Sequence, residues 1–95
     1  MALYVISWLD KPDSLEVRMT AREAHLAYMA SLDGRVKLGG PYLDDKGQMI
    51  GSLIIVEADS LEHAQAIHDN DPYKLAGLLD ASRITAWRVT LNNLA

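Results

Sequence analysis

The feature of this chain that most constrains its fold is the order of its apolar segments, which differ in how far apart their apolar residues lie. Segments rich in β-branched and aromatic residues, which favour strands, are interleaved with segments whose apolar residues recur at helical intervals. Strands are predicted over residues 3–9, 36–43, 49–57 and 83–91, helices over 20–32 and 60–70, and a short helical turn after Asp71-Pro72. The order β-α-β-β-α-β predicts a ferredoxin-like α+β fold, with an antiparallel four-stranded sheet and its helices on one face.

Two boundaries in this scheme depend on single residues. Thr20 and Glu23 fit the pattern of a capping box, so the first helix is expected to begin at Thr20 and to stop before Gly34. Residues 14–19 fit either a loop or an additional helical turn. Pro41 cannot donate to a sheet ladder, so the second strand is expected to bend, to bulge or to lie at an edge of the sheet.

Both faces of the predicted sheet are apolar. In the first strand, Leu3 and Val5 point to one face while Tyr4, Ile6 and Trp8 point to the other. Two helices can cover only one face of a four-stranded sheet, so the second face needs another surface against which to bury. The simplest such surface is a second copy of the chain, and we therefore expect a homodimer through the open sheet face.

Composition limits the domain count and the partners. A chain of 95 residues is expected to form one domain over residues 1–95. Thirteen acidic residues against nine basic ones, with no cluster of Lys and Arg, argue against nucleic-acid binding. The absence of cysteine excludes disulfides and thiolate metal sites. No secretory signal or apolar stretch long enough to span a membrane is present, so the expected location is the cytoplasm.

Two ionisable residues share the apolar stripe of the first helix. Relative to Met29, His25 lies about 40° to one side and Arg22 about 20° to the other. An Arg stem often runs along apolar surface with its charge in water, so His25 is the more informative of the two. With a helix that begins at Thr20, His25 falls in the second turn, where the helix dipole favours a neutral imidazole. His25 is then either a general base or a core histidine bonded to a backbone carbonyl.

Two further polar residues have both a structural and a functional interpretation. Asp71 precedes a proline at the start of a helical turn, where Asp is a common N-cap. Its carboxylate could equally orient His25 and stabilise the imidazolium formed during proton transfer. Ser52 is the hydroxyl on an otherwise apolar strand face, where it could contact a ligand, act as a weak nucleophile or bond to the backbone.

The remaining histidines do not form a metal site. His63 and His68 are five residues apart, a spacing that does not place two side chains on one helix face, and no third ligand is in register. Both are interpreted as structural residues at the surface or partly buried. The segment Gly39-Gly40-Pro41 lacks the pattern of a phosphate loop. It is either a backbone wall beside a pocket or a bend in the sheet.

Several short motifs occur together in a characteristic order. These are Leu3-Tyr4-Val5-Ile6, Arg22-x-x-His25-Leu26, Gly40-Pro41, Gly51-Ser52, and Asp71-Pro72-Tyr73 followed by Gly77. In this order and spacing the chain resembles the YCII-related domain proteins over nearly its full length. The resemblance implies a dimeric α+β barrel, a fold similar to that of muconolactone isomerase.

The resemblance also implies which residues form a site. It implies a pocket with a His–Asp pair, which falls on His25 and Asp71. Positions expected to line or support the pocket fall on Arg22, Gly40, Pro41, Ser52 and Tyr73. Some relatives act on ring compounds in aromatic degradation, including dehydrochlorination of chlorinated hydroxyquinones.

Two functions follow as hypotheses. The first is a small cofactor-independent enzyme that uses His25 and Asp71 as a general acid/base pair, on a small aromatic or acidic substrate, in an elimination or isomerisation. Neither a metal nor a cofactor is expected. The alternative is a non-catalytic dimeric module that binds a small ligand or a protein partner.

Overall fold

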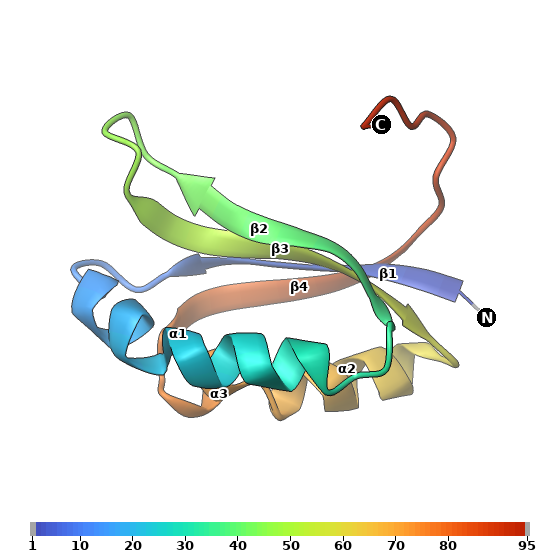
Figure 1. Cartoon of the computed structure of the whole chain (residues 1–95), viewed down its shortest axis with the longest axis horizontal. Coiled ribbons are helices and arrows are strands. Elements are labelled where there is room, and N and C mark those ends of the chain that lie inside the picture. The colour runs from blue at the N-terminus through green and yellow to red at the C-terminus, as the bar shows by residue number, and fades with distance from the viewer. Residues whose placement is uncertain (1, 95) are drawn as a thin grey trace.

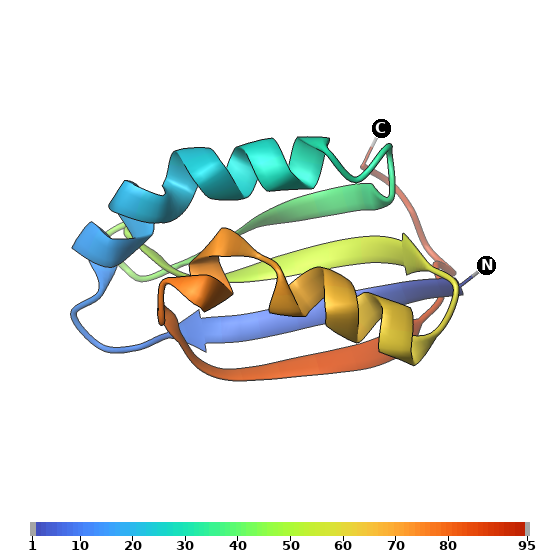
Figure 2. The same ribbon diagram turned by 90° about the horizontal axis from the view of Figure 1, so that it is seen from below.

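The computed structural model describes residues 2–94. Its elements are β1 (Ala2–Asp10), α1 (Leu15–Ala30), β2 (Val36–Leu43), β3 (Met49–Ala58), α2 (Leu61–Asp69), α3 (Pro72–Leu75) and β4 (Leu79–Trp87). The sheet has the order β2-β3-β1-β4, and each neighbouring pair is antiparallel. All helices cover the same face of the sheet (Figures 1 and 2). This arrangement confirms the predicted ferredoxin-like α+β fold.

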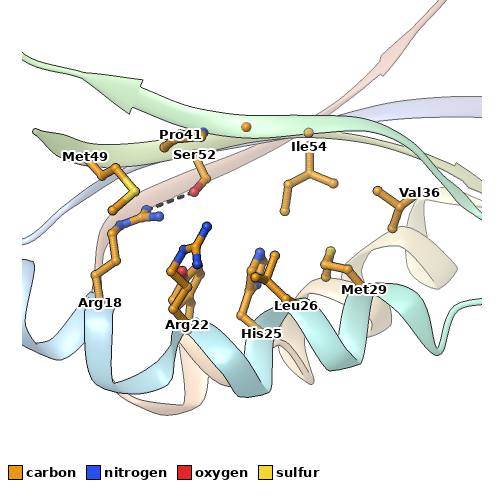
Figure 3. A pocket seen from close by; sticks show the side chains of 13 residues that line it. Arg18, Arg22, His25, Leu26, Met29, Val36, Pro41, Met49, Ser52 and Ile54 are labelled. Atoms are coloured by element: carbon orange, nitrogen blue, oxygen red, sulfur yellow. Dashed lines mark hydrogen bonds between the residues drawn. The ribbon is translucent and has the colours of Figure 1, made fainter. Parts of the chain in front are cut away.

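The core lies between the sheet and the helices. Tyr4, Ile6 and Trp8 of β1 point toward the helices, together with Ile54 and Val56 of β3, and all of them are buried. The alternation expected for β1 is therefore confirmed, because every second side chain enters the core. Helix α2 closes this core directly, whereas α1 leaves a pocket between itself and the sheet (Figure 3).

Helix α1 begins earlier than predicted. It begins at Leu15 after the N-cap Ser14, so Thr20 lies inside the helix and the predicted capping box is wrong. The cause is a tertiary contact, because Arg18 on the additional turn forms a buried ion pair with Asp10 at the end of β1. A local capping preference of about 1 kcal/mol does not outweigh such a contact.

Strand β4 also differs from its predicted range. It spans Leu79–Trp87 rather than 83–91, because its limits are set by pairing with β1. At one end Leu79 pairs with Asp10, and at the other Trp87 pairs with Leu3. Beyond Trp87, strand β1 has almost no residues left to pair with, so the chain leaves the sheet.

Strand β2 lies at the edge of the sheet, as its proline predicts. Its pairing with β3 shifts register near both ends, and Pro41 lies opposite Ser52. The next residue of β3 toward its start, Gly51, packs very closely on β1: a Cβ atom at Gly51 would lie 2.4 Å from the carbonyl oxygen of Trp8. Only glycine fits there, and because side chains alternate along β3, the next side chain, Ser52, points to the helix side of the sheet.

The other face of the sheet carries apolar side chains, and no helix of residues 2–94 covers it. After β4 the chain turns back on this side of the sheet (Figure 1). Side chains of the sheet and of this C-terminal segment line a shallow groove; they include Leu3, Leu38, Ile55, Trp87, Val89, Leu91 and Leu94. Leu91 and Leu94 are 87% and 76% exposed, so the groove leaves much apolar surface in contact with water.

None of the helices among residues 2–94 is long and apolar enough to cross a membrane.

Candidate active site

A pocket of about 320 Å3 lies between α1, the strands β2 and β3, and the short helix α3 (Figure 3). Six residues predicted for the site line it: Arg22, His25, Gly40, Pro41, Ser52 and Tyr73. The apolar part of its wall consists of Leu26, Met29, Val36, Met49 and Ile54. The stripe of α1 that carries Arg22 and His25 thus faces this cavity rather than a packed core, which explains why polar residues occur on it.

His25 and Asp71 form a direct contact. Nδ1 of His25 lies 2.8 Å from Oδ1 of Asp71, and Asp71 is 1% exposed. An ionised carboxylate only accepts hydrogen bonds, so Nδ1 of His25 is the donor in this contact, and in the neutral ring the lone pair lies on Nε2. The ring rises from α1 toward the sheet, into the pocket (Figure 3). The imidazole of His25 is therefore held in one orientation by a buried acceptor, the carboxylate of Asp71.

Asp71 is an N-cap, as its sequence context suggested, and it also contacts His25. It is the N-cap of α3, and its Oδ1 also accepts a hydrogen bond of 2.9 Å from the backbone N–H of Tyr73. Pro72 at the first helical position fixes the turn that aims this carboxylate. The cap thus holds the acceptor still beside His25.

One argument for a neutral His25 is corrected by the structure. Because α1 begins at Leu15, its N-terminus lies about three turns before His25. The effect of the helix dipole falls off within the first turn, so it does not act on this ring. The carboxylate of Asp71 instead determines which ring nitrogen faces an acceptor, because it lies 2.8 Å from Nδ1 of His25.

Tyr73 packs against the imidazole inside the pocket. Its ring is stacked on His25 with centroids 4.0 Å apart and an interplanar angle of 17°. The guanidinium of Arg18 lies 4.6 Å from the centroid of the same ring. Burial raises the pKa of the Tyr73 hydroxyl, while the positive charges of Arg18 and Arg22 oppose that rise. Tyr73 is therefore a neutral phenol at neutral pH, and its ring fixes the plane of the imidazole.

Arg18 is the site residue that sequence reasoning missed. It is 2% exposed, and its Nε and Nη2 donate to the two carboxylate oxygens of Asp10 at 2.7 and 3.0 Å. Trp8 Nε1 donates to the same carboxylate at 3.0 Å. A signal was available, because Arg18, Arg22 and His25 are spaced as residues i, i+4 and i+7 and so share one helix face. Residues 14–19 fit either a loop or a helical turn by sequence, so this spacing alone does not assign Arg18 to the helix face.

The two arginines of the pocket differ in whether a carboxylate forms an ion pair with them. Arg18 is neutralised by Asp10. Arg22 is exposed at the pocket wall, and no carboxylate of the residues that the structure describes forms an ion pair with it. The pocket thus has one unbalanced positive charge beside His25, which favours an anionic ligand group.

The other histidines lie outside the pocket. Nδ1 of His63 accepts from the backbone N–H of Asp59 at 3.0 Å on the exposed start of α2. His68 is fully buried, with Nε2 at 3.0 Å from Ser82 Oγ and its ring beside Trp8. Burial lowers the pKa of His68 and keeps it neutral. Within residues 2–94 no three potential ligands among His, Asp and Glu are grouped to hold a metal ion.

Comparison with known sequences gives several relatives of similar length. The family model of the YCII-related domain matches residues 2–88. Protein YciI of Escherichia coli is 45% identical over 86 residues, which cover 82% of this chain and 88% of that protein. An uncharacterised protein of Haemophilus influenzae is 34% identical over 83 residues, covering 79% and 85% of the two chains.

Solved structures agree with this assignment. The 5-chloro-2-hydroxyhydroquinone dehydrochlorinase of Burkholderia phenoliruptrix, solved in complex with 2,5-dihydroxybenzoquinone, is 37% identical, with a TM-score of 0.83 and coverage of 90% and 93%. An antibiotic biosynthesis monooxygenase with a TM-score of 0.57 and 7% identity, covering 96% and 100%, shares the fold alone. The fold is that of the dimeric α+β barrel superfamily, as the resemblance implied. Sequence and structure together show that the chain belongs to the family of YCII-related domain proteins.

Proposed function

We propose that this chain is a small enzyme in which His25, oriented by Asp71, acts as general acid and base on a single-ring substrate with an ionisable hydroxyl group. The observation that carries the proposal is the 2.8 Å contact between His25 Nδ1 and Asp71 Oδ1 at the wall of a pocket of about 320 Å3. In its neutral form, an imidazole whose Nδ1 proton is held by a buried carboxylate has a free lone pair on Nε2. That lone pair is what proton abstraction requires.

The proposed reaction class is elimination or isomerisation without a cofactor. His25 Nε2 takes a proton from the substrate, and Asp71 stabilises the imidazolium that forms. In an elimination, the electron pair of the broken bond to hydrogen forms a double bond, and the leaving group departs with its own bonding pair as an anion. In an isomerisation, the imidazolium returns the proton to a different atom of the substrate.

The walls of the pocket support the proposed substrate class. Arg22 supplies a positive charge for an ionised oxygen, and Ser52 supplies a hydroxyl on the opposite wall. Leu26, Met29 and Ile54 offer apolar surface for the body of the ring. The dehydrochlorinase relative was solved with 2,5-dihydroxybenzoquinone, a ring of this kind, and we carry that ligand class over to this chain as part of the proposal.

Chloride release tests the proposed class. Incubation of the chain with 5-chloro-2-hydroxyhydroquinone is expected to release chloride at least about a hundredfold faster than buffer does, because one positioned base contributes a factor of about 10²–10⁴. Free chloride is measured with an ion-selective electrode under anaerobic conditions, which suppress oxidation of the compound. Release at the buffer rate would exclude this substrate class for the chain.

The alternative function is a dimeric module that binds a ligand or a protein without catalysis. The observation that favours it is the open apolar sheet face, which concerns assembly rather than chemistry. Both functions include the homodimer, in which a second copy covers the groove along Leu38, Trp87 and Leu91. The exposed fractions of these side chains, 47%, 42% and 87%, indicate how much apolar surface a partner would cover.

Substitution on the open face tests the homodimer. The wild-type chain is expected to sediment as a dimer at micromolar concentration. Leu38→Lys is expected to raise the dimer dissociation constant at least about tenfold. In a symmetric interface both protomers carry the substitution, so two lysine charges are buried. Leu61→Lys is the matched control, since Leu61 is 54% exposed on α2, on the helix side of the sheet. A wild-type monomer, or equal effects of both substitutions, would contradict the proposed interface.

A further inference from the structure

Three side chains form a relay that ends at the wall of the pocket. Asp10 at the end of β1 accepts from Nε and Nη2 of Arg18, and the same Nη2 donates to Ser52 Oγ at 2.9 Å (Figure 3). Arg18 and Ser52 are 2% and 4% exposed. This relay lies beside the His25–Asp71 pair and shares no side chain with it.

The relay settles the direction of the hydrogen bond at Ser52. A guanidinium has only donors, so Ser52 Oγ must be the acceptor in its contact with Arg18. The hydroxyl then still has its one hydrogen to donate. Among residues 2–94, Arg18 is the hydrogen-bond partner that the structure gives to this oxygen. A buried hydroxyl hydrogen without an acceptor is costly, and an oxygen atom of a ligand in the adjoining pocket would remove that cost.

We infer that Arg18 is a positioning residue which makes the Ser52 hydroxyl a hydrogen-bond donor to an oxyanion of the ligand. The inference rests on the proposed function in one respect, since it takes this pocket as the ligand site. It adds a selection rule: the ligand presents an ionised or carbonyl oxygen to Ser52, not a group that can only donate. During proton abstraction by His25, negative charge that moves onto that oxygen is stabilised by the same donor.

The geometry explains why arginine is needed at position 18. Its guanidinium is fixed on one edge by both oxygens of Asp10 and on its face by the ring of Tyr73. Only a planar fork can hold these contacts and also reach Ser52. A lysine would keep the positive charge next to Asp10 but would lose the directed contact with the hydroxyl.

Binding of 4-nitrophenol tests the inference, because its yellow phenolate band reports the ionisation state of the bound molecule. In wild type the bound molecule is expected to ionise at a lower pH than the free one. Ser52→Ala is expected to weaken phenolate binding about tenfold, the usual effect of losing one hydrogen bond to a charged oxygen. Ser52→Thr keeps the hydroxyl and is expected to retain the lowered ionisation pH. Ser82→Ala, which removes a strand hydroxyl outside the pocket, is the matched control.

A double-mutant cycle tests whether Arg18 acts through Ser52. Arg18→Lys alone is expected to weaken phenolate binding at least about fivefold, and Arg18→Lys with Ser52→Ala no more than Ser52→Ala alone. Additive effects, or Ser52→Ala binding the phenolate as wild type does, would overturn the inference. In that event, a loss of chloride release in His25→Gln would leave the proposed function standing. If 4-nitrophenol does not bind wild type at any pH, the inference about Arg18 and Ser52 fails, whereas the chloride-release assay decides the proposed function separately.

Discussion

Replacement of His25 by glutamine is expected to lower kcat/KM for chloride release by a factor of about 10²–10⁴. Glutamine can still donate a hydrogen bond to the buried Asp71, so the local structure is kept while the titratable nitrogen is lost. The loss is expected mainly in kcat, because Arg22 and Ser52 remain to bind the substrate. Steady-state kinetics of the purified variant measure both parameters.

The matched control for this variant is His63→Gln. His63 lies at the exposed start of α2, outside the pocket, and contacts the backbone of Asp59. Its replacement is expected to leave turnover within about twofold of wild type. A folded His25→Gln protein that turns over at the wild-type rate would rule out the imidazole as base.

Arg18→Met is expected to lower the free energy of unfolding by about 3–5 kcal/mol. The side chains of Arg18 and Asp10 are 3% and 6% exposed, so the substitution leaves an uncompensated buried carboxylate. A domain of this size has a total stability of roughly 5–15 kcal/mol, so the loss is a large part of it. Urea unfolding monitored by tryptophan fluorescence measures the change, because Trp8 donates to the same carboxylate.

Two further variants test whether the buried, unpaired carboxylate causes the loss of stability in Arg18→Met. Asp10→Asn combined with Arg18→Met removes both charges and is expected to regain part of the lost stability. Arg35→Met removes a partly exposed ion pair, in which Nη1 of Arg35 lies 3.8 Å from Oδ1 of Asp59, and a hydrogen bond from Nη1 to the Glu57 carbonyl; it is expected to cost about 1–2 kcal/mol. Equal losses in the free energy of unfolding for Arg18→Met and Arg35→Met would show that the buried Asp10–Arg18 pair stabilises the fold no more than the pair at the surface does.

The fold could be predicted from the sequence because its periodicity is local. The alternation of Tyr4, Ile6 and Trp8 defines a strand with a buried face, and the β-α-β-β-α-β order leaves few topologies. The ends of α1 and β4 could not be predicted in the same way. The first depends on an ion pair between Arg18 and Asp10, and the second on the length of β1, so both are set by contacts between distant segments.

The candidate site was accessible from sequence only in part. The spacing on α1 places Arg22 and His25 on one face, but periodicity does not show whether that face meets a core or a cavity. His25 and Asp71 are 46 residues apart, so their pairing is one of two interpretations of Asp71 that the sequence allows, and the family resemblance favours it. Arg18 lies in residues 14–19, which fit a loop as well as a helical turn, so its place on this face does not follow from the sequence. The relay to Ser52 likewise depends on packing between α1, β1 and β3.

The most direct test of the account is ¹⁵N NMR of the His25 ring at about pH 8, where an ordinary imidazole is neutral. The account predicts that Nδ1 carries the proton, that Nε2 is unprotonated, and that the Nε2 resonance moves when 4-nitrophenol fills the pocket. Asp71→Asn is expected to remove the preference for the Nδ1–H form. A proton found on Nε2 in the free protein, or an Nε2 resonance that does not move at saturation, would contradict the account.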